Sequence, residues 1–176
     1  MTMQLGVFFG DAVGDIGTKL LYPLGTKREE GGNTYRYVER NDATVTLAAD
    51  VLVYRGSTQA TFWEVTGDVS DADSAFAAGV IKGAVADDGF GWMLTKGYVA
   101  ALKKKTGTAE YSWVKGDVLC AAQAATDDGR ASRLVIAAST KVSAAELRTA
   151  LERPIGHAAA LATKASLTGA AYIDLE

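Results

Sequence analysis

The chain has 176 residues, a formal net charge of −3 and a hydrophobic fraction of 48%. This length predicts one domain with a core of its own. The acidic balance argues against nucleic-acid binding, which normally requires a basic surface, and the apolar runs are too short to span a bilayer. The N-terminus has no basic region, and Asp11 and Asp15 interrupt its apolar stretch, so we identify no signal peptide and expect synthesis in a cytoplasm.

Residues 1–21 differ in composition from the rest of the chain. Glycines at positions 6, 10, 14 and 17 disfavour a helix, each by about 1 kcal/mol relative to alanine. Apolar side chains on so flexible a backbone indicate an extended N-terminal arm that lies on an apolar surface, either of its own domain or of a neighbouring subunit. The residues expected to contact a partner are Leu5, Val7, Phe8, Phe9, Val13 and Ile16.

Residues 22–176 are expected to form a single β-rich domain. The chain has 19 glycines and 2 prolines, and short strands joined by glycine turns predict a small β-barrel or sandwich. Alternating, β-prone sequence predicts strands, while the charged stretch 26–33 predicts a loop. The first strands are expected at 34–39, 50–55 and 60–65.

The stretch 80–119 predicts a β-meander on which the domain is built. Its apolar runs are separated by Asp87-Asp88-Gly89 and Lys96-Gly97, and glycine supplies the positive φ that tight turns need. The runs are 80–85, 92–94, 98–102 and 111–114. Further strands are expected at 118–122, 133–138 and 170–175.

One short helix is predicted between the last strands. Ser143 and Glu146 form a capping box, and residues 144–151 are good helix formers. Pro154 marks the end of the helix.

The tail of the chain echoes the meander. Gly79–Val85 and Arg153–Ala159 are both small-residue strands followed by a turn and a second strand. The echo suggests that the first and last parts of one small barrel pair with each other.

No residue pattern predicts a catalytic or metal site. His157 is the only histidine, which excludes a histidine-based triad and a two-histidine metal site, so we expect a satisfied or partly exposed strand residue. Cys120 cannot form an internal disulfide, and nothing near it signals a lowered pKa, so a buried structural thiol is expected. Asp68, Asp71 and Asp73 lack the glycine and terminal glutamate of a calcium loop.

Two other groups of residues also favour structural interpretations. Trp63, Trp92 and Trp113 could line a sugar site, but each sits in a strand, so core packing is favoured. The cluster Lys103-Lys104-Lys105 is expected to be a solvated hairpin tip. The sequence therefore predicts a protein that binds other molecules and is not an enzyme, with no cofactor.

A succession of short motifs resembles small virion proteins of tailed bacteriophages that are encoded beside the major capsid protein. The order of the motifs carries the resemblance, which spans residues 22–175. The motifs are Tyr22-Pro23-Leu24-Gly25-Thr26, Tyr35-Arg36-Tyr37-Val38, Ala49-Asp50-Val51-Leu52, Ala78-Gly79-Val80, Gly91-Trp92-Met93, Gly97-Tyr98-Val99, Lys115-Gly116-Asp117-Val118-Leu119 and Ile155-Gly156-His157-Ala158. Neither residues 1–21 nor the helix at 143–152 matches the family.

The resemblance implies a capsid decoration, or cement, protein on the virion surface. Its partners would be the major capsid protein and further copies of itself, with a trimer favoured because shell decorators often occupy local threefold axes. Small barrels close their own strand edges, and many copies on one lattice bind with avidity. Two alternatives remain: a head-tail or tail component, and a carbohydrate-binding module or hydrolase that uses exposed tryptophans.

Overall fold

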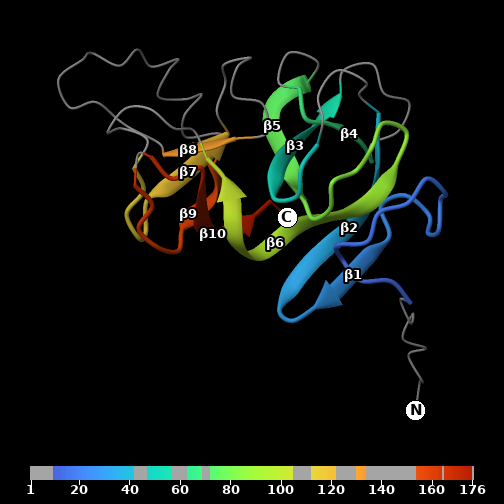
Figure 1. Cartoon of the computed structure of the whole chain (residues 1–176), viewed down its shortest axis with the longest axis horizontal. Helices are drawn as coiled ribbons and strands as arrows, with labels where there is room; N and C mark the ends of the chain where they lie inside the picture. The colour runs from blue at the N-terminus through green and yellow to red at the C-terminus, as the bar shows by residue number, and fades with distance from the viewer. Residues whose placement is uncertain are drawn as a thin grey trace.

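The computed structural model describes residues 10–41, 47–56, 63–68, 72–104, 112–121, 130–133, 154–163 and 165–175. These residues form one ten-stranded sheet, so the expected mainly β fold is confirmed (Figure 1). The strands are β1 (Lys27–Glu30), β2 (Asn33–Arg40), β3 (Val51–Gly56), β4 (Glu64–Thr66), β5 (Ala72–Ile81), β6 (Phe90–Lys103), β7 (Val118–Ala121), β8 (Ala131–Arg133), β9 (Pro154–Ala158) and β10 (Thr168–Asp174). In this described part of the chain, no helix has the length and apolarity needed to cross a membrane.

Five strands close the first barrel, which confirms the expected barrel. Their order is β2-β4-β3-β5-β6, and β6 pairs back onto β2. The β2–β4 pair is parallel, and the other four pairs are antiparallel. Every strand of this barrel contributes to one buried apolar cluster, which includes Val38, Val51, Val53, Val65, Ile81 and Met93. Closure leaves no free strand edge within this ring.

A second barrel follows along the same sheet. Its strand order is β6-β10-β9-β7-β8, and a parallel bridge between Lys104 and Ala131 returns from β8 to the end of β6. Its strands contribute small and medium apolar side chains to the larger buried cluster. They include Val99, Leu102, Leu119, Ala121, Ile155, Ala158, Ala171 and Ile173.

The two barrels have the same topology when β2 is counted as the first strand of one and β6 as the first strand of the other. In each, the first strand pairs in parallel with the third, the third pairs with the second, the second with the fourth, the fourth with the fifth, and the fifth with the first. Strand β6 is therefore the fifth strand of the first barrel and the first strand of the second (Figure 1). Within the residues that the structure describes, the two barrels thus repeat one five-strand order and share β6, and the second closes through a single bridge.

Each barrel buries one cationic side chain at the end of its first strand. Arg40 ends β2, and its Nη1 donates to the carbonyl of Val85 at 3.0 Å. Lys104 directly follows β6, and its Nζ donates to the carbonyl of Ser166 at 3.1 Å. Both carbonyls belong to the loop between the fourth and fifth strands of their barrel. The cation thus ties that loop across one end of the barrel.

The backbone repeats the same contact. The N–H of Arg40 donates to the carbonyl of Gly89, and the N–H of Lys104 donates to the carbonyl of Leu167. Each accepting residue directly precedes the fifth strand of its barrel. The expectation of a solvated lysine cluster is wrong for Lys104, which is buried. Burial lowers the pKa of its amine, because the charged form loses hydration.

Several local expectations differ from the structure. The predicted loop 26–33 contains β1 and a tight turn at Gly31-Gly32, because the two glycines supply the positive φ that joins β1 to β2. The predicted turn at Lys96-Gly97 is not a turn, because β6 continues through it. The pairing expected from the echo is wrong, because Gly79–Val85 contains the end of β5 and Arg153–Ala159 contains β9, and these two strands do not pair with each other. The helix expected at 143–152 lies outside the described residues.

Gly97 lies in β6 where the strand passes from the first barrel to the second. Its φ is +129°, and a Cβ there would collide with Oδ1 of Asn33, which accepts a hydrogen bond from the N–H of Tyr98 at 2.9 Å. Gly97→Ala should lower the free energy of unfolding by about 3 kcal/mol, measured by chemical denaturation, because it adds a clash to backbone strain.

Gly116 provides the matched control for this prediction. Its φ is +93°, but an added Cβ would meet no atom within 4 Å. Gly116→Ala should therefore show backbone strain alone, about 1 kcal/mol. Equal losses for the two variants would contradict the role assigned to Asn33.

Candidate partner-binding surface

Residues 10–24, the anchored segment, lie along the outside of the first barrel. Gly17 forms an antiparallel bridge with Phe90, with N–H to oxygen distances of 3.1 and 2.8 Å. The approach at Gly83 is so close that a Cβ there would collide with Cγ2 of Ile16 and lie 2.9 Å from the carbonyl oxygen of Gly14. The part of the predicted arm that the structure describes therefore lies against its own domain.

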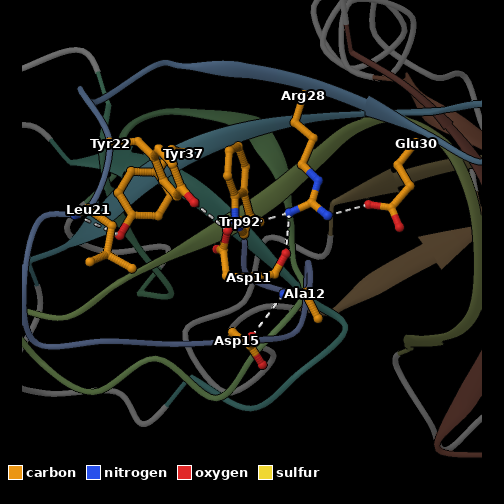
Figure 2. A network of polar contacts seen from close by, with 9 residues as sticks. All are labelled: Asp11, Ala12, Asp15, Leu21, Tyr22, Arg28, Glu30, Tyr37 and Trp92. Carbon is orange, nitrogen blue, oxygen red and sulfur yellow. Dashed lines mark hydrogen bonds and ion pairs between the residues drawn. The ribbon is translucent and has the colours of Figure 1, made fainter. Parts of the chain in front are cut away.

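The carboxylate of Asp11 fixes this segment to the barrel. It accepts hydrogen bonds from the hydroxyl of Tyr22 at 2.6 Å and from Nε1 of Trp92 at 2.7 Å. Nη1 of Arg28 lies 3.7 Å from the carboxylate and donates to the main-chain carbonyl of Asp11 at 2.8 Å (Figure 2). Nη2 of Arg28 pairs with Glu30 at 2.6 Å, which fixes the guanidinium in place.

The electrostatics of Asp11 favour its charged form. Burial acts to raise the pKa of the carboxyl, but the hydrogen bonds from Tyr22 and Trp92, its own backbone and the charge of Arg28 together hold the pKa below its ordinary value of 3.8. The hydrogen bond to Asp11 raises the pKa of the Tyr22 hydroxyl, because an ionised tyrosine could not donate it. The network is thus a carboxylate surrounded by donors.

Aromatic packing adds to the polar anchor. The ring of Tyr22 meets that of Tyr37 edge-on at a centroid distance of 5.2 Å and lies 5.4 Å from the ring of Trp92. The guanidinium of Arg28 lies 5.4 Å from the centre of the Trp92 ring. The hydroxyl of Tyr37 accepts a hydrogen bond from the N–H of Leu21 at 3.5 Å. The outward pair Tyr37 and Trp92 is therefore covered by the segment.

The six predicted contact residues fall into three groups. Val13 is half-buried and packs against the main core cluster. Ile16 is 49% exposed. The remaining four, Leu5, Val7, Phe8 and Phe9, lie outside the described residues.

Two exposed leucines complete the outer side of the anchored segment. Leu20 is 56% exposed and Leu21 is 62% exposed. We call Ile16, Leu20 and Leu21 the outer apolar face. The two leucines are not among the predicted contact residues, although they are the last apolar pair before Tyr22, whose hydroxyl bonds to Asp11.

The tryptophans, Cys120 and His157, which were weighed as candidates for a binding or catalytic role, lie in the following surroundings. Trp92 and Trp113 are fully buried, as the core-packing prediction required, and Trp63 is half-buried below the guanidinium of Arg36. Cys120 is half-buried, and burial raises the pKa of its thiol, which disfavours the reactive thiolate. His157 is exposed on β9, in agreement with its prediction. The described residues contain no group of three potential metal ligands.

Comparisons of the chain with protein families, with curated proteins and with solved structures find no match. The resemblance to phage virion proteins therefore rests on the order of the sequence motifs.

Asp11→Ala should lower the free energy of unfolding by about 2–3 kcal/mol, because it leaves the buried N–H of Trp92 unpaired and removes charge-assisted hydrogen bonds. Because the pKa of Asp11 is depressed in the folded state, its stabilising effect is complete above the unfolded value of 3.8 and is lost as pH falls through the folded pKa. Denaturation curves should thus show the difference between wild type and Asp11→Asn shrinking below about pH 4.

Asp15→Asn is the matched control, since Asp15 lies in the same segment and is exposed. Among the described residues, its carboxylate accepts a local hydrogen bond alone, from the N–H of Ala12 at 2.8 Å. This variant should change stability by less than about 0.5 kcal/mol at any pH. A pH dependence equal to that of Asp11→Asn would show that net charge, and not the anchor, is responsible.

Proposed function

We propose that the protein is a virion structural protein that decorates a bacteriophage head, binding the outer surface of the major capsid protein lattice and stabilising it. It acts by contact and carries out no turnover. Its place would be the capsid surface of the virion. The family resemblance suggests this class, and the geometry of the described residues supports it.

The observation that carries the proposal is the anchored segment with its outer apolar face. Leucines that sit on a segment fixed by buried polar groups lose little conformational freedom when a partner covers them. Burying the exposed part of Leu20 and Leu21 would contribute about 1–2 kcal/mol for each side chain. Such a contact is weak alone, but many copies on one lattice gain avidity from it.

The barrels suit a protein that must stay folded on a shell. Closed strands offer few backbone groups to unwanted pairing partners, so association is directed to side-chain surfaces. The sugar-binding alternative relied on exposed tryptophans, but Trp92 and Trp113 are fully buried and cannot stack on a ligand. We therefore favour the lattice contact over the sugar site.

The test mixes purified protein with capsids that lack it. Leu20→Ser/Leu21→Ser should weaken binding about tenfold or more, because each loses an apolar contact of about 1–2 kcal/mol. Co-sedimentation measures the bound fraction, and the capsid melting temperature measures stabilisation. Electron microscopy of decorated particles separates the head surface from the tail.

Leu161→Ser/Leu167→Ser is the matched control. These leucines are 71% and 67% exposed but lie outside the anchored segment. The control should bind capsids as wild type does. If wild type ignores capsids, or if the Leu20 and Leu21 variant binds equally well, the proposed function is wrong.

A further inference from the structure

A row of exposed side chains crosses the outer face of the second barrel. Tyr98 of β6 is opposite Tyr172 of β10, Tyr172 is opposite His157 of β9, and His157 is opposite Val118 of β7. Tyr98 is 45% exposed and Tyr172 48%. The ring of Tyr172 lies 5.4 Å from that of Tyr98 and 5.4 Å from that of His157. We call these four residues the aromatic row.

The aromatic row borders a surface hollow of about 500 Å³, with the β1–β2 turn at Gly31-Gly32 on the other side. At its rim, Lys96 and Asp174 form an ion pair at 3.5 Å, so the charges of this pair balance. Among the residues that the structure describes, the side chains of Tyr98, Tyr172 and His157 have no hydrogen-bond partner. The hollow is aromatic on one wall and carries no excess charge.

The first barrel carries a similar outward aromatic pair on the corresponding strands. Tyr98 and Tyr172 face outward where the first and fifth strands of the second barrel pair. Tyr37 and Trp92 are likewise opposite each other on the first and fifth strands of the first barrel, although they lie closer to the buried cation at the end of their barrel than Tyr98 and Tyr172 do. In both barrels, the residue that follows each aromatic side chain along its strand is buried.

The two outward aromatic pairs also differ in what covers them. The anchored segment precedes β2 and covers Tyr37 and Trp92, with the ring of Tyr22 against both. The second barrel begins with the shared strand β6, so no such segment precedes it, and its aromatic pair is left exposed. Strands β6, β10 and β9 are each paired on both sides. A partner must therefore pack on these side chains and cannot add to the sheet as another strand.

We propose that the aromatic row of one copy receives residues 5–9 of a second copy of this chain. Residues 1–9 carry no charged side chain, which matches the charge-balanced hollow, and Phe8 and Phe9 supply the rings that Tyr22 supplies on the first barrel. The described chain starts beside β2, on the side of the molecule opposite β9 and β10 (Figure 1). The first described residues thus lie away from the aromatic row of the same molecule.

This inference deepens the proposed function and rests on it, because it names the self-contact of the decorating protein. The test uses full-length chains without capsids, so its outcome is separate from that of capsid binding. Analytical ultracentrifugation compares wild type, the donor variant Phe8→Ser/Phe9→Ser and the acceptor variant Tyr98→Ser/Tyr172→Ser. Near-UV circular dichroism verifies that each variant is folded.

Wild type should self-associate, and each variant should do so at least about tenfold more weakly, since two aromatic contacts are lost. The donor variant keeps an intact row, and the acceptor variant keeps intact phenylalanines. Mixing the two should therefore restore one productive contact and give a one-to-one pair. Leu161→Ser/Leu167→Ser should behave as wild type does.

Three results would overturn the inference. They are a monomeric wild type at every concentration, variants that associate as wild type does, and a mixture that fails to pair.

Discussion

Strand β6 has to satisfy two barrels at once, and the rest of the structure depends on this constraint. Its first half pairs with β2 and β5, and its second half with β10. A strand that changes partners midway must leave β2 without leaving backbone donors unpaired. Gly97 and Asn33 meet this requirement, because the amide oxygen of Asn33 accepts the N–H of Tyr98 just beyond the last β2–β6 pair. The side chain of Asn33 thus continues the β2–β6 hydrogen-bond ladder beyond the point where the two strands stop pairing.

Sharing a strand also makes the two repeats unequal. Both retain the buried cation that ties the loop between the fourth and fifth strands, through Arg40 in one barrel and Lys104 in the other. Only the first barrel has the anchored segment before its first strand, and this segment covers the outward pair Tyr37 and Trp92. The first strand of the second barrel is β6, which already belongs to the first barrel. The anchor at Asp11 is consistent with this, since a segment that covers apolar side chains without a strand ladder needs other contacts to keep it in place. Hydrogen bonds to a buried carboxylate are among the strongest available.

The sequence predicted the β class, the barrel and several strands, because period-2 patterns and glycine turns are local signals. The echo of Gly79–Val85 and Arg153–Ala159 was interpreted as pairing within one barrel, but β5 and β9 do not pair, because similarity between two strand–turn–strand units does not say where each one lies in the sheet. Lys96-Gly97 was interpreted as a turn because glycine with a polar neighbour usually ends a strand, whereas here the glycine lets one strand serve two barrels. The anchor of Asp11 on Trp92 joins residues far apart in the chain, and no local pattern signals such a contact.

The proposed self-contact joins two different surfaces, the segment before Gly10 on one copy and the aromatic row on another. Two copies can exchange it about a two-fold axis, or it can run from each copy to the next as a heterologous contact. Contacts of this kind close into a ring when the rotation between copies divides a full turn, and otherwise continue as a filament. In a ring, every copy is related to the next by rotation about one axis, so the outer apolar faces all point to the same side. A ring whose axis is perpendicular to a shell would present every copy of Leu20 and Leu21 to the lattice together. A two-fold axis in the plane of the shell would instead turn one copy away from it. In a trimer, which the family resemblance implies, the proposed self-contact and the proposed capsid contact would reinforce each other, because each copy held by its neighbours would bind the lattice at a raised effective concentration.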